Sequence, residues 1–130
     1  MYVIGLACAA CRLPLLSGVL AAAYIRGVQS QGGVTTVKDF VGNECETDRY
    51  TSNSIIDERA LRELYLVPIE YAVKQGGTLG IMTAYNRLNG AYCNDQAWLL
   101  TGVLRDEWGF EGFITTDWLP GADTVLAAEA

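Results

Sequence analysis

Hydrophobic residues at helical spacing alternate along this chain with short runs of β-branched or apolar residues. The helical spacing predicts helices over residues 14–31, 56–75 and 95–108, and a fourth helix that begins near residue 120. Three runs between these helices have the composition of strands, and they end near Lys38, Thr83 and Asp117. The pattern therefore predicts helices and strands in regular alternation.

Each predicted helix has an apolar stripe, and Pro68 should kink the second helix. In the first helix the spacing is carried by Leu16, Val19, Leu20, Ala23, Tyr24, Gly27 and Val28. In the next two helices the residues expected to face the core are Leu61, Leu64, Tyr65, Pro68, Ile69, Ala72, Trp98, Leu99, Val103 and Leu104. Phe113 and Ile114 suit a buried strand.

Alternating helices and strands favour a parallel sheet with crossover helices, so the fold class is α/β. Two architectures fit, a doubly wound sheet and part of a (β/α)8 barrel. A doubly wound nucleotide-binding fold should have a glycine-rich turn after its first strand, whereas Gly76, Gly77 and Gly80 precede a strand. The barrel is favoured. A whole barrel needs about 250 residues, so we expect an incomplete barrel segment of about three parallel strands alternating with four helices.

Composition and charge narrow the classes of function. The 130 residues are 51% hydrophobic and 18% charged with a formal net charge of -6, which predicts one soluble globular unit. Because the balance is acidic and no basic run occurs, a nucleic-acid partner is not expected. The chain has no histidine, which excludes nucleophile pairs of the Ser-His or Cys-His kind and removes the commonest metal ligand.

Residues 1–12 form an apolar leader of unclear origin. The leader lacks a basic start and is too short to span a bilayer, so it predicts neither a signal peptide nor a membrane anchor, and the localisation stays unassigned. Cys8 and Cys11 have the spacing of a redox or metal motif, but no second pair and no histidine complete a zinc site. We expect them to be ordinary small apolar residues and expect no metal site.

Polar side chains follow each predicted strand, where the carboxyl ends of parallel strands share one edge. The residues concerned are Lys38, Asp39 and Arg49 after the first strand, Met82 and Tyr85 at the second, and Asp117 and Trp118 at the third. Such a set suits a neutral polyhydroxylated ligand, with Asp117 as a nucleophile on an anomeric carbon. The alternative for Asp117 is a cap on the next helix. For Glu44, Glu46 and Asp48 we favour surface ion pairs or caps.

Three segments of the chain resemble sequence blocks of the family 3 glycoside hydrolases. Residues 37–50, Val-Lys-Asp-Phe-Val-Gly-Asn-Glu-Cys-Glu-Thr-Asp-Arg-Tyr, resemble the family's Lys-His-Phe…Asn…Glu…Arg block. Residues 81–90 contain a Met-Thr-Ala-Tyr-Asn block, and residues 98–118 resemble the segment that ends in the family's Ser-Asp-Trp nucleophile signature. The resemblance runs from about Leu13 to the end, and the β-glucosidase branch is nearest. It implies that residues 13–130 are part of the family's N-terminal barrel domain.

The resemblance implies a retaining β-glucosidase that hydrolyses O-glycosyl bonds at the non-reducing end of β-D-glucosides. Asp117 would be its catalytic nucleophile, and the substrate-binding residues would be Lys38, Asp39, Arg49, Met82, Tyr85 and Trp118. No cofactor is implied. The partner would be a β-glucoside or oligosaccharide substrate, with neither nucleic acid nor membrane.

Two departures from the family pattern leave an alternative open. Asp39 stands where the family has His, so at this position an ionised carboxylate accepts hydrogen bonds and cannot donate them. A retaining enzyme also needs two carboxylates about 5–5.5 Å apart, and the family places its acid/base in a later domain. The isolated chain is therefore expected to be inactive, and the alternative is a degenerate, non-catalytic sugar-binding or interaction segment. An incomplete barrel should also self-associate through its exposed edges.

Overall fold

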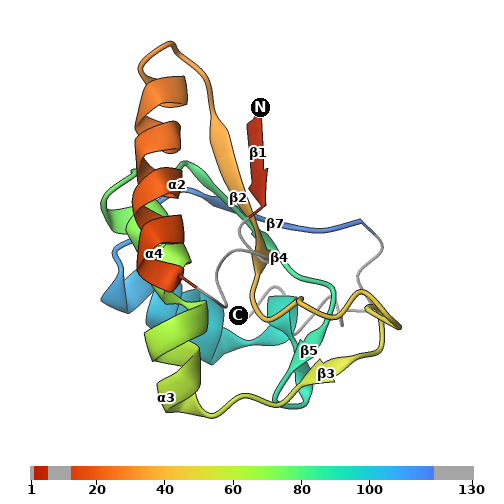
Figure 1. Cartoon of the computed structure of the whole chain (residues 1–130). Coiled ribbons are helices and arrows are strands. Elements are labelled where there is room, and N and C mark those ends of the chain that lie inside the picture. Colours follow the sequence, from red (N-terminus) through yellow and green to blue (C-terminus); the bar gives the residue numbers. More distant parts are fainter. Residues whose placement is uncertain (1, 6–12, 119–130) are drawn as a thin grey trace.

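Four parallel strands form the main sheet, in the order β1-β2-β4-β7 (Figure 1). The computed structural model describes residues 2–5 and 13–118. Its main-sheet strands are β1 (Tyr2–Gly5), β2 (Thr35–Phe40), β4 (Gly80–Thr83) and β7 (Phe113–Thr116). Neighbours in the sheet are also successive main-sheet strands along the chain, and the order never reverses. This order is typical of a (β/α)8 barrel, whereas a doubly wound sheet has a point at which the order switches.

Helices connect each strand to the next. They are α2 (Pro14–Gln29), α3 (Glu58–Ala60), the π-helix η1 (Leu61–Tyr65), α4 (Val67–Lys74), the 3-10 helix η2 (Cys93–Asp95) and the π-helix η3 (Trp98–Glu107). The α/β class and the parallel sheet predicted from the sequence are confirmed. The helix expected from residue 120 lies outside the described residues.

The helical segment between β2 and β4 is interrupted where the sequence predicted a kink. The Asp57 side chain caps its start, with an oxygen 3.0 Å from the backbone nitrogen of Ala60. Leu66 separates η1 from α4, and Pro68 lies in the first turn of α4, where a missing N–H leaves no internal hydrogen bond unmade.

The hydrophobic core lies between the sheet and the helix layer. It includes Ile25 of α2, Val37 and Phe40 of β2, Ile81 of β4, Ile69 and Ala72 of α4, and Leu99, Val103 and Leu104 of η3. The rings of Phe40 and Trp108 are 6.0 Å apart between centroids, which joins the end of β2 to the end of η3. Because one cluster joins the strands to all three connecting segments, the helices form one layer on the sheet.

Three residues expected inside are exposed: Leu64 at 42%, Trp98 at 41% and Phe113 at 43%. The Trp98 ring lies beneath the Arg62 guanidinium, whose carbon is 5.4 Å from the ring centroid, so it packs on the surface of the helix layer. Phe113 belongs to β7, which has a single strand neighbour in this sheet. For Leu64 the prediction of a buried position is also wrong, because η1 buries Leu61 and leaves Leu64 on the outer side.

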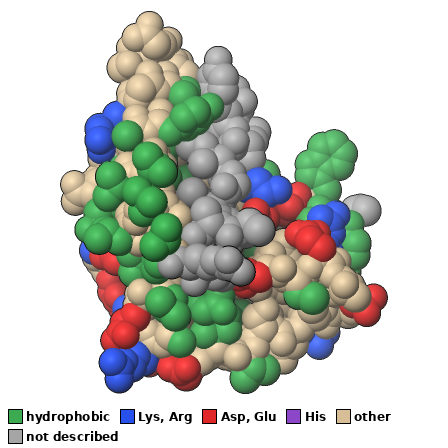
Figure 2. Space-filling model, viewed as in Figure 1, with side chains coloured by type: hydrophobic (Ala, Val, Ile, Leu, Met, Phe, Trp, Pro, Cys, Tyr) green, Lys and Arg blue, Asp and Glu red, His purple; other side chains and the backbone are tan. Residues whose placement is uncertain are grey.

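Helix α2 buries small residues and exposes large ones. Its buried residues are Ser17, Gly18, Ala21, Ala22 and Ile25, whereas Leu16, Val19, Leu20 and Tyr24 are about half exposed. A Cβ atom at Gly18 would lie 2.8 Å from Cβ of Tyr71 on α4, so the two helices approach too closely for a larger side chain. Figure 2 shows the apolar side chains gathered along this side of the molecule. The helix predicted from the spacing is therefore present, but the large apolar residues that carried the spacing lie on its outer face.

Four further strands were not predicted. Strand β1 lies within the apolar leader and pairs in parallel with β2. A second, small sheet joins β3 (Asn53–Ser54), β5 (Arg87–Leu88) and β6 (Ala91–Tyr92) in the loops that follow β2 and β4. Paired segments of two residues are too short to produce a hydrophobic period, which is why these loops showed no strand signal. Among the described residues, no helix has the length and apolar character needed to cross a membrane.

Candidate active site at the carboxyl ends of the strands

Strands β2, β4 and β7 end in one row across the sheet. Phe40 pairs with Thr83, and Thr83 pairs with Thr116. All three strands run in the same direction, so the loops that follow them leave from the same edge. The predicted convergence of these loops is therefore present in the fold.

An irregularity in β2 places two consecutive polar residues on the site side of the strand. Val37 and Phe40 are both fully buried in the core, and the register with β4 shifts between them. Asp39 has φ of 65°, a left-handed conformation that Asp adopts more readily than most residues. Because two residues rather than one separate the core positions, Lys38 and Asp39 both leave the core face.

Asp39 lies in a field of several charges. Its carboxylate is 3.8 Å from Lys38 Nζ and is largely shielded from solvent. Burial raises the pKa of Asp39 above its ordinary value, and the charges of Asp117 and Glu46 act in the same direction. Lys38 and a hydrogen bond from Asn43 oppose the rise in that pKa without cancelling it. The structure thus gathers three carboxylates and one ammonium group beside the end of β2.

Asp117 follows β7 directly and is hydrogen-bonded to Tyr85. The Tyr85 ring is buried; burial raises the pKa of its hydroxyl, and the bond to Asp117 raises it further. Asp117 Oδ1 also accepts from the backbone nitrogen of Trp118 at 2.8 Å. These contacts hold the carboxylate over the strand ends. The alternative of a helix cap concerns residues after 118, which lie outside the described part.

Arg49 packs against two tyrosine rings that also contact each other. Its guanidinium carbon is 4.6 Å from the centroid of Tyr85 and 5.2 Å from that of Tyr50, and the two rings meet edge to face at 4.7 Å. Arg49 Nη1 is 2.9 Å from Glu46 Oε2, so the ion pair expected for Glu46 is confirmed. Hydrogen bonds to Tyr50 and Glu46 raise the pKa of Arg49, which stays charged.

The structure brings together most, but not all, of the site predicted from the sequence. Lys38, Asp39, Arg49, Tyr85 and Asp117 occupy the shared edge. Met82 is half-buried on β4, and it follows the core residue Ile81, so it lies on the opposite face of the sheet from the helices. Trp118 is beside Asp117, but its side chain is 81% exposed. The functional roles of these residues remain predictions.

Two members of the site were not singled out by the sequence analysis. Tyr50 ends the 37–50 block, and its position next to Arg49 is the sequence signal that could have identified it. Asn43 appears in the sequence only as one residue of the 37–50 block, yet its Nδ2 donates to Glu46 Oε1 at 3.2 Å. A short polar residue in a loop gives no hydrophobic pattern, so its partners can be identified only from the fold.

The described residues were compared with the requirements of a metal site and of a reactive thiol. Within residues 2–5 and 13–118 no three His, Cys, Asp or Glu side chains are grouped so as to hold a metal ion. Cys45 is exposed, whereas Cys93 is buried, and burial raises the pKa of the Cys93 thiol to about 11. The Cys8 and Cys11 pair lies outside the described residues.

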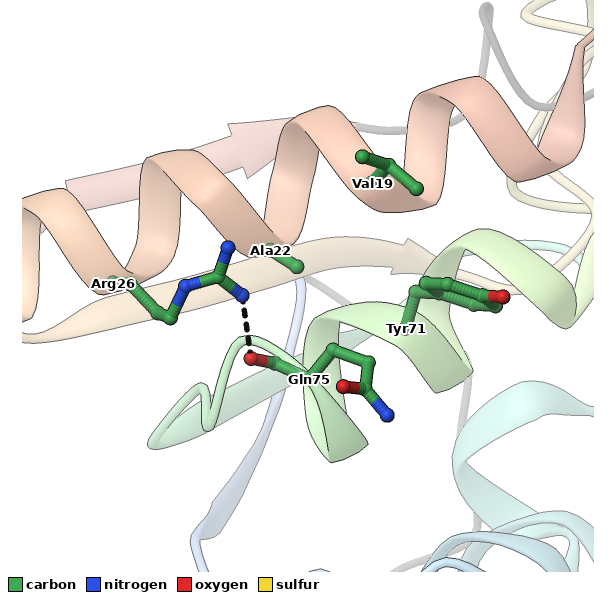
Figure 3. A pocket seen from close by; sticks show the side chains of 5 residues that line it. All are labelled: Val19, Ala22, Arg26, Tyr71 and Gln75. Atoms are coloured by element: carbon green, nitrogen blue, oxygen red, sulfur yellow. Dashed lines mark hydrogen bonds between the residues drawn. The ribbon is translucent and has the colours of Figure 1, made fainter.

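A groove on the helix side has a different character. It lies between α2 and α4, has a volume of about 410 Å³ and is lined by Val19, Ala22, Arg26, Tyr71 and Gln75 (Figure 3). Arg26 Nη1 donates to the backbone oxygen of Gln75 at 2.8 Å. The lining has no carboxylate, so the groove lacks the acid groups on which glycoside hydrolysis depends.

Known proteins are similar to this chain in sequence and in fold. A family model described as the glycosyl hydrolase family 3 N terminal domain matches residues 13–127. A β-glucosidase of Rhizobium radiobacter is 52% identical over 117 residues, which are 90% of this chain and 14% of that protein. An exo-alpha-(1->6)-L-arabinopyranosidase of Bifidobacterium longum is 47% identical over 110 residues, which are 85% of this chain and 14% of that protein.

The fold agrees with a solved family structure. β-Glucosidase 3B of Thermotoga neapolitana, in complex with α-D-glucose, superposes with a TM-score of 0.87 at 48% identity, covering 89% of this chain and 16% of that one. The chain thus spans about 14% of the length of the curated relatives named above. It belongs to glycosyl hydrolase family 3, and it carries part of that family's N-terminal domain.

Proposed function

We propose that this chain carries the nucleophile side of the sugar pocket of a retaining β-glucosidase. The observation that carries the proposal is the contact of Asp117 with Tyr85 at an edge that also holds Lys38, Asp39 and Arg49. The family membership makes glycoside hydrolysis the chemistry to which such a group belongs.

In the proposed reaction an oxygen of Asp117 attacks the anomeric carbon of the terminal glucosyl unit. A bond forms between that oxygen and the anomeric carbon while the bond to the leaving oxygen breaks, and water later hydrolyses the glycosyl ester. Tyr85 holds the carboxylate by its hydrogen bond, and Lys38 and Arg49 donate to sugar hydroxyls. Arg49 is suited to this role because Tyr85, Tyr50 and Glu46 already fix its guanidinium.

The acid/base carboxylate has no candidate among the described residues. Asp39 and Glu46 lie beside the nucleophile, but both belong to the loop and strand end that we assign to sugar binding. We therefore expect little or no sustained turnover of p-nitrophenyl β-D-glucoside by the 130-residue chain. Sustained nitrophenol release that disappears in Asp117→Asn would contradict this expectation.

A substrate with a very good leaving group tests the nucleophile without an acid. 2,4-Dinitrophenyl 2-deoxy-2-fluoro-β-D-glucoside should transfer its sugar to Asp117, because dinitrophenolate departs without protonation and the fluorine slows hydrolysis of the ester. Peptide mass spectrometry should find the label on the peptide that contains Asp117, and Asp117→Asn should remain unlabelled. Equal labelling of both proteins, or none of either, would count against the proposed function.

The sugar specificity is also part of the proposal. The named relatives include both a β-glucosidase and an arabinopyranosidase, and D-glucose is proposed here because the superposed structure is a glucose complex. Comparing chemical-shift changes caused by glucose and by L-arabinose would separate the two. Stronger binding of arabinose would refute glucose as the preferred sugar.

The second candidate function is sugar binding without hydrolysis, and Asp39 in place of the family's His is the observation that favours it. Replacing Asp39→His would test it, because a buried His can donate to a sugar hydroxyl that an ionised Asp cannot. Glucose binding by both proteins, with no labelling of Asp117 in either, would favour this alternative.

Self-association is proposed as well. Leu13, which precedes α2, and Leu16 and Leu20 on its outer side are more than half exposed, and together they form an apolar face. The molar mass from light scattering should increase with protein concentration. A constant monomer mass would refute this proposal.

A further inference from the structure

The loop that carries Arg49 has its two ends side by side. This Arg49 loop comprises residues 42–52, between β2 and β3, and it contains Glu46, Arg49 and Tyr50. At its base, Ser54 Oγ donates to the backbone oxygen of Gly42 at 2.7 Å. A short hydrogen bond thus joins the exit of the loop to its entry.

The side chain of Asn86, between β4 and β5, contacts both ends of this loop. Its Nδ2 is 3.3 Å from the backbone oxygen of Val41, before the loop, and 3.4 Å from Ser54 Oγ, after it. The same nitrogen donates to the backbone oxygen of Arg87 at 3.0 Å. Only 1% of Asn86 is exposed, so these contacts are shielded from water. Asn86 therefore ties the base of the Arg49 loop to the chain that follows β4.

Gly42 shows how closely these groups approach one another. Its φ is 83°, in the left-handed region that glycine adopts without steric cost. A Cβ atom at Gly42 would lie 3.5 Å from Cβ of Ser54 and 3.6 Å from Nδ2 of Asn86. The entry of the loop therefore packs directly against both side chains.

The orientation of the Asn86 amide follows from its neighbours. Asn86 Oδ1 is buried and has no hydrogen-bond partner among the described residues. Turning the amide over would place Oδ1 against the backbone oxygens of Val41 and Arg87, which are also acceptors. A buried carbonyl without a donor costs free energy, and a leucine would fill a similar volume without that cost. The property that distinguishes asparagine here is the nitrogen that reaches both ends of the loop.

Asn86 is also next to a residue of the candidate active site. It follows Tyr85, whose buried ring is 4.6 Å from the Arg49 guanidinium carbon and 4.7 Å from the Tyr50 ring. Arg49 and Tyr50 belong to the loop, whereas Tyr85 belongs to the segment that Asn86 anchors. The packing of Arg49 on Tyr85 therefore requires the loop and this segment to keep a fixed separation.

We propose that Asn86 and Ser54 are positioning residues that form a clamp, which closes the Arg49 loop and keeps the Arg49 guanidinium on the Tyr85 ring. The inference rests on the proposed function for its meaning in sugar binding. An arginine that is already fixed in the free protein loses less conformational entropy when it donates to a sugar hydroxyl. The clamp thus prepares the pocket without touching the sugar.

Trypsin cleavage after Arg49 measures opening of the loop in the native 130-residue chain, because the protease acts on the open form. Asn86→Leu has a similar volume and no donor. It should raise the rate of cleavage after Arg49, relative to cleavage after Arg105 of η3, about tenfold. A general loss of stability would expose both sites and leave this ratio unchanged. A ratio within about twofold of the wild type would overturn the proposal.

Asn94→Leu is the matched control for Asn86→Leu. Asn94 is also buried, but its Nδ2 has no hydrogen-bond partner among the described residues. The cleavage ratio of this variant should equal that of the wild type. An equal rise of the ratio in both variants would count against the clamp.

Ser54→Ala covers the case in which Asn86→Leu does not fold. It removes the hydroxyl that joins the loop ends, and it should raise the same cleavage ratio about threefold. Ser30→Ala is its control, because Ser30 Oγ also donates to a backbone oxygen, at 2.8 Å, but at the end of α2. Equal ratios in Ser54→Ala and Ser30→Ala would refute the clamp.

The NMR signal of the Arg49 Nε–H group separates positioning from stability alone. In the wild type the rings of Tyr85 and Tyr50 should shift this signal away from that of a free arginine. Asn86→Leu should return the signal toward the free value, whereas Asn94→Leu should not. An unchanged Arg49 signal in a folded Asn86→Leu protein would overturn the positioning role.

A glucose titration distinguishes failure of this proposal from failure of the proposed function. Glucose should bind the wild type, and Asn86→Leu should bind it more weakly. Failure of glucose to bind the wild type would count against the proposed function, and the cleavage ratio would still decide whether Asn86 closes the loop. Equal glucose affinity of the two proteins would refute the role of the clamp in sugar binding.

Discussion

The entry into strand β7 depends on one arginine, and replacing it tests how the loop before Asp117 is held. Arg105 Nη1 donates to the backbone oxygens of Phe110 and Gly112, both at 2.7 Å. Its guanidinium carbon is also 5.1 Å from the centroid of the Phe110 ring. Arg105→Met keeps an unbranched apolar stem and removes both hydrogen bonds.

The expected cost follows from these two bonds. A hydrogen bond that involves a charged group contributes about 1.5–3 kcal/mol when buried. Both bonds here share one nitrogen and are only partly buried, so water can replace part of each. We take about 1 kcal/mol for each and expect Arg105→Met to lower the free energy of unfolding by about 2 kcal/mol.

Urea denaturation followed by tryptophan fluorescence measures this change. With a slope of about 2 kcal/mol/M, the midpoint should fall by about 1 M. Arg59→Met is a matched control, because the Arg59 side chain is 83% exposed and forms a surface ion pair with Glu63 at 3.0 Å. Its unfolding free energy should change by less than about 0.5 kcal/mol. Equal effects of the two substitutions would refute the role given to Arg105.

Three further predictions concern helix packing, charge burial and thiol reactivity. Gly18→Ala should lower the free energy of unfolding by about 1–3 kcal/mol despite the better helix propensity of alanine, because the new Cβ would meet α4. Gly27→Ala is the control: its new Cβ would have open space around it, so this substitution should raise the free energy of unfolding by up to about 1 kcal/mol. Equal urea midpoints of the two variants would contradict the prediction. Burial raises the pKa of Asp39 above its value in the unfolded chain, so the folded protein loses stability as the pH rises from the unfolded pKa through the folded pKa. The stability of Asp39→Asn relative to wild type should therefore be greater at about pH 7 than at about pH 3. The same difference in urea midpoint between variant and wild type at the two pH values would argue against this prediction. After iodoacetamide treatment of the native chain, peptide mass spectrometry should find Cys45 modified and Cys93 protected. Cys93 should be protected because it is buried and because burial raises the pKa of its thiol to about 11. Modification of Cys93 at the rate of Cys45 would be inconsistent with the fold.

The order of the longer helical segments and of strands β2, β4 and β7 was predictable because it depends on long, periodic patterns. Val37 and Ile81 lie in β-rich runs, and Leu99 and Val103 repeat at helical spacing, so their burial followed from the sequence. The outward face of α2 did not, because the close approach at Gly18 decides which face packs. Hydrophobicity alone ranks Leu20 above Ala21, whereas the contact with α4 selects the smaller residue.

The site was predictable to the extent that parallel strands share one edge. Lys38 lies near the end of β2, Tyr85 and Asp117 follow β4 and β7, and the fold brings the carboxyl ends of these strands to one side as expected. The left-handed Asp39 and the hydrogen bond from Asn43 to Glu46 could not be inferred, because they depend on a local register shift and on which carboxylates lie nearby. Backbone conformation at one residue and contacts between loop side chains depend on the three-dimensional arrangement of the strand ends, which the sequence pattern does not specify.

The division of the molecule into a strand-end edge and a helix layer has a practical consequence. Every described residue to which we propose a role in the reaction belongs to a strand or to a loop after one, and none belongs to α2, α4 or η3. Directed evolution could therefore diversify the outer helical surface for thermal tolerance while the sugar-facing chemistry stays constant. Libraries aimed at new sugars would instead vary the segments that follow β2, β4 and β7.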